Sequence, residues 1–254
     1  MYKFLFLVGS AINHFEEGKL SKFSTEERFQ QTVETIQSIL WHIPDAYILI
    51  YELSETELDP KHKEYFERVS DAYIECKDDY VVKGLYENAH IDPNRFTYIK
   101  SMLECRGIEL ALHHIGREQL FTDATRIFKI SGRYSLNDDF NINDYKSNFL
   151  THKYVMKTYE YEPRFEQMDN LYATLYGCKG CVVTGLWSFD RYLFLDVMYV
   201  LHRSFEYMEK AIQITAGIDI EHSFYHFLDP KKIIDIPVLG LNLIKGMDGE
   251  TYTL

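Results

Sequence analysis

Near its start the chain reads Tyr2-Lys3-Phe4-Leu5-Phe6-Leu7-Val8-Gly9-Ser10-Ala11, an apolar run that ends in small residues. Apolar runs of this length, closed by a turn of small residues, are typical of buried β-strands. A second run of the same kind extends from Ala46 to Tyr51 and is followed by Glu52-Leu53-Ser54. We therefore expect two neighbouring buried strands whose ends carry small and polar residues.

The segment between these two runs has the pattern of an amphipathic helix. Ser24 and Glu27 are spaced as a capping box, which marks a helix N-terminus. Apolar residues then recur at helical spacing up to Pro44, which ends the pattern: Phe29, Val33, Ile36, Leu40 and Ile43. The predicted order is strand, helix, strand.

The same alternation continues along the chain. Asp59 and Pro60 predict the start of another helix, and strands are expected at 72–76 and 126–130. A helix is expected over 98–115, whereas the mixed, polar stretch 77–94 predicts a loop with at most one helical turn. Strands that alternate with helices predict an α/β, doubly wound, mostly parallel sheet with helices on both faces, whose ligand lies beyond the C-terminal ends of the strands.

Beyond residue 140 the pattern is less regular. We expect a strand at 182–187, a long helix over 192–215, a helical segment over 219–227 and an extended segment over 232–243. A chain of 254 residues without an internal repeat or a linker predicts a single domain with a helical C-terminal part.

Composition limits the function classes. The formal net charge of −12 argues against nucleic acid or an anionic membrane as a partner, because both require clustered basic residues. The apolar run 4–8 is too short for a signal peptide or a transmembrane segment, so we expect a cytoplasmic protein. In that compartment the four cysteines are expected to stay reduced. The C-x-x-C pair Cys178 and Cys181 has no second pair at zinc-ligand spacing.

Candidate binding residues follow the ends of the predicted strands. Small residues let the backbone approach a ligand, a carboxylate after the second strand suits a ribose or base, and basic residues at the fourth strand suit a diphosphate. These candidates are Gly9, Ser10, Ala11, Glu52, Ser54, Lys129, Gly132 and Arg133, with Arg106 as a further cation. The other interpretation of Arg133 is a surface ion pair with Asp138. Neither G-x-G-x-x-G nor G-x-x-x-x-G-K-[ST] is present, which argues against a classical dinucleotide site and a P-loop.

Carboxylates supply the candidate metal ligands and bases. Asp138 and Asp139 offer hard oxygen ligands for a divalent metal, although Asn137-Asp138-Asp139 is equally typical of a simple turn. Glu221 and Asp190 are the candidate catalytic residues, since a carboxylate can act as general base toward a sugar hydroxyl.

The segment Phe128-Lys129-Ile130-Ser131-Gly132-Arg133-Tyr134, with Val8-Gly9-Ser10-Ala11 and the stretch 25–32, resembles a group of GT-A-type glycosyltransferase-like proteins of surface-polysaccharide gene sets and large viruses. The resemblance implies a glycosyltransferase that moves a sugar from a nucleotide-sugar donor to a glycan or other acceptor. It further implies that residues 1–145 bind the donor and that the helix-rich residues 146–254 bind the acceptor. Three aromatic residues near predicted turns are candidate acceptor contacts: Tyr134, Trp187 and Tyr192.

The sequence departs from the GT-A pattern at the metal motif. The Asp-x-Asp expected after the fourth strand is replaced by Ser131-Gly132-Arg133. Either Mn²⁺ or Mg²⁺ is held nearby by Asp138 or Asp139, or Arg133 meets the diphosphate charge without a metal. Two other functions remain open, a nucleotidyl- or phosphoryl-transferring enzyme on a similar sheet and a non-catalytic binding or assembly protein.

Overall fold

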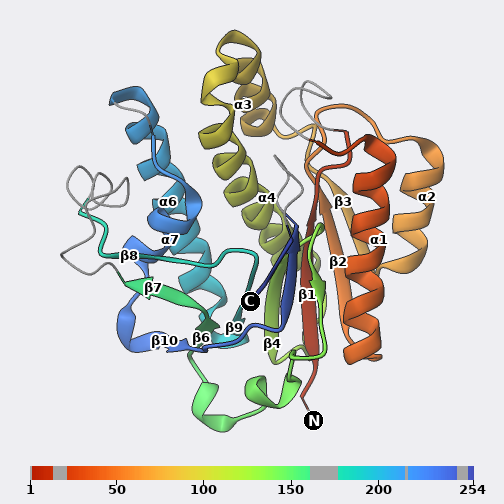
Figure 1. Cartoon of the computed structure of the whole chain (residues 1–254), viewed down its shortest axis with the longest axis vertical. Helices are drawn as coiled ribbons and strands as arrows, with labels where there is room; N and C mark the ends of the chain where they lie inside the picture. Colours follow the sequence, from red (N-terminus) through yellow and green to blue (C-terminus); the bar gives the residue numbers. More distant parts are fainter. Residues whose placement is uncertain (1, 14–21, 161–176, 215–216, 245–250) are drawn as a thin grey trace.

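The computed structural model describes residues 2–13, 22–160, 177–214, 217–244 and 251–254, and shows an α/β architecture (Figure 1). The strands are β1 (Phe4–Ser10), β2 (Tyr47–Glu52), β3 (Ala72–Glu75), β4 (Arg126–Ser131), β5 (Ser135–Leu136), β6 (Tyr154–Met156), β7 (Thr158–Glu160), β8 (Gly180–Val182), β9 (Leu186–Asp190), β10 (Ile233–Asp235), β11 (Leu241–Ile244) and β12 (Thr251–Thr253). The α-helices are α1 (Thr25–His42), α2 (Pro60–Val69), α3 (Tyr80–Ile91), α4 (Phe96–Glu118), α6 (Phe194–Ile214) and α7 (Ile220–Phe227).

Seven of the described strands form one sheet in the order β10-β6-β9-β4-β1-β2-β3. The pairs β3-β2, β2-β1, β1-β4 and β6-β10 are parallel, whereas β9 runs antiparallel to both β4 and β6. The C-terminal ends of β1, β2 and β4 therefore meet at one edge, as the strand and helix alternation predicted. Two small sheets, β12-β11-β5 and β7-β8, lie beside this main sheet.

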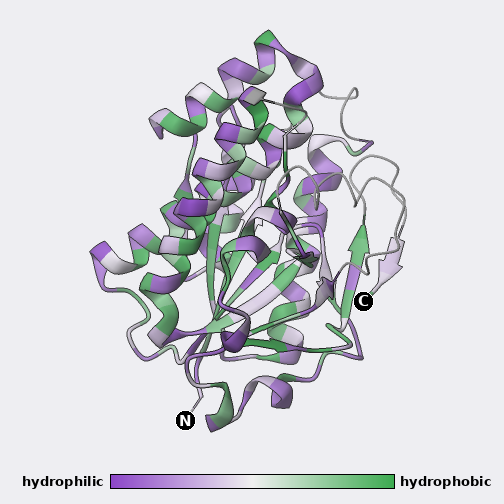
Figure 2. Ribbon diagram, turned by 90° about the vertical axis from the view of Figure 1, so that its left-hand side faces the viewer, coloured by the Kyte–Doolittle hydropathy of each residue, from purple (hydrophilic) through white to green (hydrophobic). Residues whose placement is uncertain are grey.

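Alternating side chains of β1 enter two separate cores. Leu5 and Leu7 belong to the core under α3, α4, α6 and α7, whereas Phe6 and Val8 belong to the core under α1 and α2. Both sets are fully buried, because a parallel strand covered on both faces has no solvent side. Figure 2 shows the strands as mostly hydrophobic ribbon between helices that also carry hydrophilic residues. Helices thus cover both faces of the sheet.

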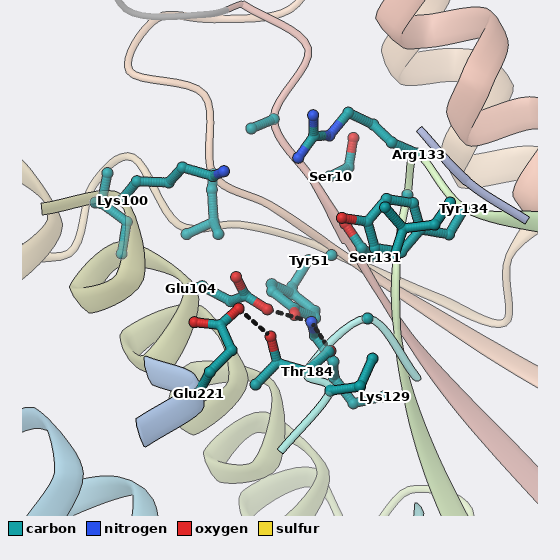
Figure 3. Close-up of a pocket in the computed structure, with 18 of the residues that line it drawn as sticks. Ser10, Tyr51, Lys100, Glu104, Lys129, Ser131, Arg133, Tyr134, Thr184 and Glu221 are labelled. Atoms are coloured by element: carbon teal, nitrogen blue, oxygen red, sulfur yellow. Dashed lines mark hydrogen bonds and ion pairs between the residues drawn. The ribbon is translucent and has the colours of Figure 1, made fainter. Parts of the chain in front are cut away.

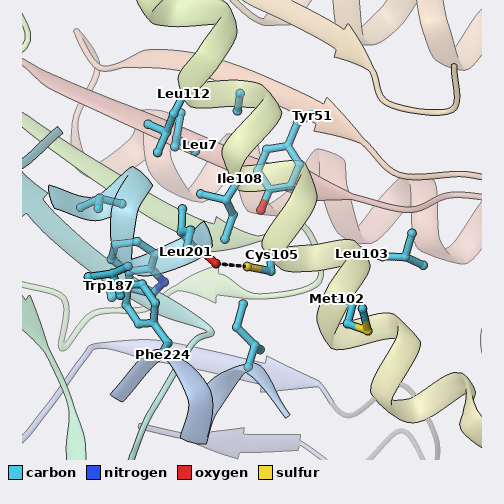
Figure 4. Packing of buried hydrophobic residues seen from close by; sticks show 14 of the residues in the cluster. Leu7, Tyr51, Met102, Leu103, Cys105, Ile108, Leu112, Trp187, Leu201 and Phe224 are labelled. Carbon is cyan, nitrogen blue, oxygen red and sulfur yellow. Dashed lines mark hydrogen bonds between the residues drawn. The ribbon is translucent and has the colours of Figure 1, made fainter. Parts of the chain in front are cut away.

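Helix α4 packs closely against the sheet and α6 (Figure 4). A β-carbon on Gly107 would lie 2.8 Å from the Tyr51 ring, so the glycine sets how near this helix comes to β2. On its other side Cys105 donates from Sγ to the carbonyl oxygen of Leu201 at 3.2 Å. Further along this core the rings of Trp187 and Phe224 pack with centroids 4.8 Å apart. These contacts fix α4 as the helix that bounds one side of the sheet edge.

Several local predictions are confirmed. Ser24 and Glu27 form the capping box of α1, and Asp59 caps α2 with Pro60 at its first position. The four strands expected in the first half all occur in the main sheet. Helices α6 and α7 begin within two residues of the expected positions. Residues 215 and 216 of the long predicted helix lie outside the described ranges.

Two predictions are wrong. The stretch expected to be a loop contains α3, whose N-cap Asp79 accepts from the backbone of Val81 and Val82 at 3.1 and 3.2 Å. The buried residues of that helix recur at helical spacing, and exposed polar residues between them masked the pattern: Val82, Leu85, Tyr86 and Ala89. The single strand expected over 182–187 is instead the end of β8 and the start of β9, separated by residues 183–185.

Within the part of the chain that the structure describes, no helix is long and apolar enough to cross a membrane. The four cysteines all lie in this part, and no disulfide joins them.

Candidate functional site

A pocket of about 470 Å³ opens at the edge where β1 and β4 end. Its walls are the turns after these strands, the first half of α4, the segment before β9 and the first turn of α7 (Figure 3). This is the edge at which ligands bind in open α/β sheets, because loops there are free of the strand ladder. The predicted residues Gly9, Ser10, Ala11, Gly132 and Arg133 all line it, as does Lys129.

The turn after β4 places Arg133 at the pocket. Tyr134 donates its backbone N–H to the carbonyl oxygen of Ser131 at 3.1 Å, and Gly132 donates to the carbonyl oxygen of Gly9 at 2.7 Å. A β-carbon on Gly132 would lie 2.9 Å from that same oxygen and 2.9 Å from Oγ1 of Thr32. Glycine is therefore required for the two strand ends to approach this closely.

Four cations line the pocket: Lys129, which lies on its floor, and Arg28, Lys100 and Arg133, which we call the cationic rim. Arg28 donates from Nε to the carbonyl oxygen of Ala11 at 2.6 Å. Figure 3 shows Lys100 and Arg133 extending toward each other from opposite sides of the opening. The Cζ atom of Arg133 lies 5.9 Å from the centre of the Tyr134 ring.

The cations of the rim influence one another. Burial and the charge of Arg133 lower the pKa of Arg28 to about 10. The side chain of Lys100 is accessible from the pocket, yet the surrounding protein and then the charge of Arg133 lower its pKa. Burial is the larger cause of both shifts, and the smaller contribution of Arg133 reflects the closeness of the three cations.

The floor of the pocket carries a second group of charges. Lys129, 1% exposed, contacts the carboxylate of Glu104 and donates to the carbonyl oxygen of Thr184 at 2.7 Å. The hydroxyl of Thr184 in turn donates to Oε1 of Glu221 at 2.8 Å. This chain of contacts joins β4, α4, the segment before β9 and α7.

Glu221 is the carboxyl group of this floor whose pKa is shifted toward neutrality. Burial, followed by the charges of Asp219 and Glu104, raises its pKa to about 7, and the Thr184 hydrogen bond opposes that rise. A carboxyl group with a pKa near neutrality exchanges protons readily in both directions, which is what general acid-base catalysis requires.

Tyr51 contributes a buried hydroxyl at the same place. Its side chain is fully buried and lines the pocket, and its hydroxyl has no hydrogen-bond partner. Burial, with a smaller effect of Glu104, raises its pKa well above the ordinary value. A neutral hydroxyl in this state is available to bind a polar group of a ligand.

Glu52 and Ser54 do not line the pocket. Oε1 of Glu52 accepts from the backbone N–H groups of Ile12 and Ser54 at 3.0 and 2.9 Å, and from the Ser54 hydroxyl at 2.6 Å. The Ser54 hydroxyl also accepts from the backbone of Asn13 at 2.7 Å. Glu52, predicted to contact a ribose, instead links the loop after β1 to the loop after β2 through these hydrogen bonds.

Asp138 and Asp139 lie outside the pocket, in an exposed turn. Asp139 donates its backbone N–H to Oδ1 of Asn137 at 2.9 Å, and Phe140 donates to the Asn137 carbonyl oxygen at 3.0 Å. These are the contacts of a turn. The structure does not bring either carboxylate to the side of the pocket where Arg133 lies.

Asp190 lies at the opposite edge of the sheet. It pairs in register with Arg126, the first residue of β4, because β9 runs antiparallel to that strand. Its carboxylate accepts from the backbone of Tyr192 at 2.9 Å. This candidate catalytic residue does not line the pocket, because β9 is reversed with respect to β4.

Of the remaining candidates, one lines the pocket and the others do not. Arg106 pairs with Asp79 at 2.7 Å and does not reach the pocket. Of the aromatic candidates Tyr134 lines the pocket, Trp187 is a core residue, and Tyr192 is exposed beside Asp190.

Sequence reasoning missed several polar lining residues, among them Arg28, Lys100, Glu104 and Thr184. Lys100 and Glu104 are one turn apart on α4 and therefore lie on the same face of the helix. This spacing was the signal in the sequence that could have identified them. Arg28 was hidden because it lies among polar residues of the first turns of α1. No family model matches the chain, and none of the curated proteins matches it.

Proposed function

We propose that the protein is a glycosyltransferase of the GT-A type that takes its sugar from a nucleotide-sugar donor. The observation that supports this proposal is that the cationic rim and Glu221 line the same pocket at the ligand-binding edge of the sheet. One group suits a leaving phosphate and the other suits an acceptor hydroxyl.

In this reaction the acceptor oxygen forms a bond to the anomeric carbon of the donor sugar while the bond from that carbon to the phosphate oxygen breaks. The electron pair of the broken bond leaves with the nucleotide, so negative charge grows on the phosphate oxygens. Fixed cations that meet this charge lower the barrier. The hydroxyl proton of the acceptor passes to the carboxylate of Glu221, whose pKa of about 7 suits a base at neutral pH.

The proposed donor site also has the required dimensions and surface. A pocket of about 470 Å³ lies in the range of small-molecule sites. Beside the cationic rim, the wall carries the small residues Gly9, Ser10 and Gly132, which leave room for the phosphate groups of a ligand.

A thermal-shift screen with UDP-, GDP-, CMP- and dTDP-linked sugars tests the proposal. We expect one nucleotide class to raise the melting temperature of the wild type and of Arg117→Ala, whose side chain is exposed on α4, but not of Arg133→Ala. The same donor should then release its nucleotide in the presence of an acceptor glycan.

Other outcomes would point elsewhere. Donor binding without turnover on any acceptor would favour a binding or assembly protein. Turnover of a nucleoside triphosphate with release of pyrophosphate would favour a nucleotidyl-transferring enzyme.

A further inference from the structure

We infer that the pocket binds the diphosphate of its ligand through the side chains of Arg133 and Lys100, together with Arg28, and without a divalent metal. The inference rests on the proposed function only for the identity of the whole ligand, because a diphosphate alone is sufficient to test it.

The residues that would hold a metal do not fit that role. A GT-A site of the usual kind would place carboxylates after β4, and this chain has Ser131-Gly132-Arg133 there. The nearest carboxylates along the chain, Asp138 and Asp139, occupy the exposed turn and do not line the pocket.

The carboxylates that do line the pocket are engaged on its floor. Among the described lining residues these are Glu104 and Glu221. Glu104 forms an ion pair with Lys129, and Glu221 accepts the hydrogen bond of Thr184. Figure 3 shows both on the side of the pocket away from Arg133.

Arg133 and Lys100 differ from Lys129 in this respect. No described carboxylate lies within ion-pair distance of Arg133 or Lys100. Burial is the main cause of the lowered pKa of Arg28 and of Lys100, and repulsion by the charge of Arg133 adds to it in both cases. A doubly charged anion between Lys100 and Arg133 would relieve that repulsion, and the guanidinium group offers paired donors to two phosphate oxygens.

The local backbone supports the same ligand. Gly132 lets the turn after β4 press against the carbonyl oxygen of Gly9, and the next side chain is then free to reach across the opening. Arg133 is intermediate in exposure, stacked beside Tyr134, so it is held near the pocket before any ligand arrives. Such preorganisation reduces the entropic cost of binding.

The experiment is a calorimetric titration of the full chain with inorganic pyrophosphate in buffer containing EDTA, repeated with excess Mg²⁺. We expect binding in EDTA that Mg²⁺ does not strengthen and that weakens as NaCl is raised. Arg133→Ala and Lys100→Ala should each weaken it roughly tenfold to a hundredfold, as expected for loss of a charge-assisted hydrogen bond.

Matched controls are Arg117→Ala and Lys83→Ala, which remove exposed cations from the helices α4 and α3 outside the pocket. Binding that appears only with Mg²⁺, or that is unchanged in Arg133→Ala, would overturn the inference. No binding under either condition would also overturn it. Metal-free pyrophosphate binding in a protein that turns over no nucleotide-sugar would leave this inference standing and reject the glycosyltransferase proposal.

Discussion

The hydroxyl group of Tyr51 occupies the space that a side chain on Gly9 would need. A β-carbon built on this glycine overlaps the hydroxyl oxygen and lies 2.7 Å from the ring carbon that carries it. The two residues are paired in register on β1 and β2, and both line the pocket. The position of a buried, unpartnered hydroxyl beside the ligand site therefore depends on the absence of one side chain.

Gly9→Ala should lower the free energy of unfolding by about 1 to 3 kcal/mol, the usual cost of adding a methyl group to a packed interior. Chemical denaturation measures the change. Gly84→Ala is the control, because no atom lies within 4 Å of its β-carbon and alanine favours a helix by about 0.5 to 1 kcal/mol.

The double variant Gly9→Ala/Tyr51→Phe separates packing from other effects. Removal of the hydroxyl relieves the overlap, so the double variant should be more stable than Gly9→Ala alone. Equal stabilities for the two would show that the clash with Tyr51 is not the cause.

Glu221→Gln should abolish the acid limb of the pH-rate profile and lower turnover by about 10²- to 10⁴-fold, the usual contribution of a general base. In the wild type the rate should rise as pH increases through about 7, because only the deprotonated carboxylate accepts a proton. Steady-state rates between pH 5 and 9 test this. A pH-rate profile that is the same in Glu221→Gln as in the wild type would show that Glu221 is not the catalytic base.

The same carboxyl group makes stability depend on pH. Its folded pKa of about 7 lies above the ordinary value of 4.5, so the folded state favours the protonated form and loses stability as pH rises from about 4.5 to 7. Glu221→Gln should therefore be more stable than the wild type at pH 8, by about 1 to 3 kcal/mol after allowance for partial exposure, and should gain little at pH 4.

Thr184→Val should move the acid limb of the wild-type profile to higher pH. The Thr184 hydroxyl donates to Glu221 and opposes the rise in its pKa, and valine has the same shape without the donor. Thr184→Ser keeps the hydroxyl and should keep the profile. An acid limb that stays in place in the valine variant would contradict the assignment of this limb to Glu221.

Lys129→Met should destabilise the protein by about 2 to 4 kcal/mol, because it leaves the Glu104 carboxylate without its cation and the Thr184 carbonyl without a donor. The further change Glu104→Leu should recover part of that loss. Lys83→Met removes an exposed partner of Asp78 and should cost less than about 1 kcal/mol. Denaturant titrations that find the double variant no better than the single one would argue against a buried charge pair.

The sheet and one wall of the pocket were predictable because they depend on local patterns. The apolar runs of β1 and β4 and the small residues after them indicated that Gly9, Ser10, Gly132 and Arg133 would share an edge, and they all line the pocket. The rule that parallel strands end at one edge was sufficient for this part.

Strand direction and helix orientation limited the remaining predictions. Nothing in the residues of β9 indicates that it runs antiparallel, and this direction places the candidate Asp190 beside Arg126, away from the pocket. Arg28 and Lys100 depend on which face of α1 and α4 turns to the opening, and tertiary packing sets that. Glu52 follows β2 as expected, but its carboxylate meets backbone N–H groups of two loops before it can meet a ligand.

The reversed strand β9 also determines what each part of the chain can do alone. The pocket takes Arg133 from the segment before residue 146 and Thr184 and Glu221 from the segment after it. The two segments meet along the five paired positions of β4 and β9, where α4 packs against α6 and α7, and where β5 pairs with β11. A chain cut after Tyr145 would give two fragments that each hold only part of the charged lining. Ligand affinity in a mixture of these fragments would then report reassembly of these contacts, which makes the protein a natural subject for fragment complementation.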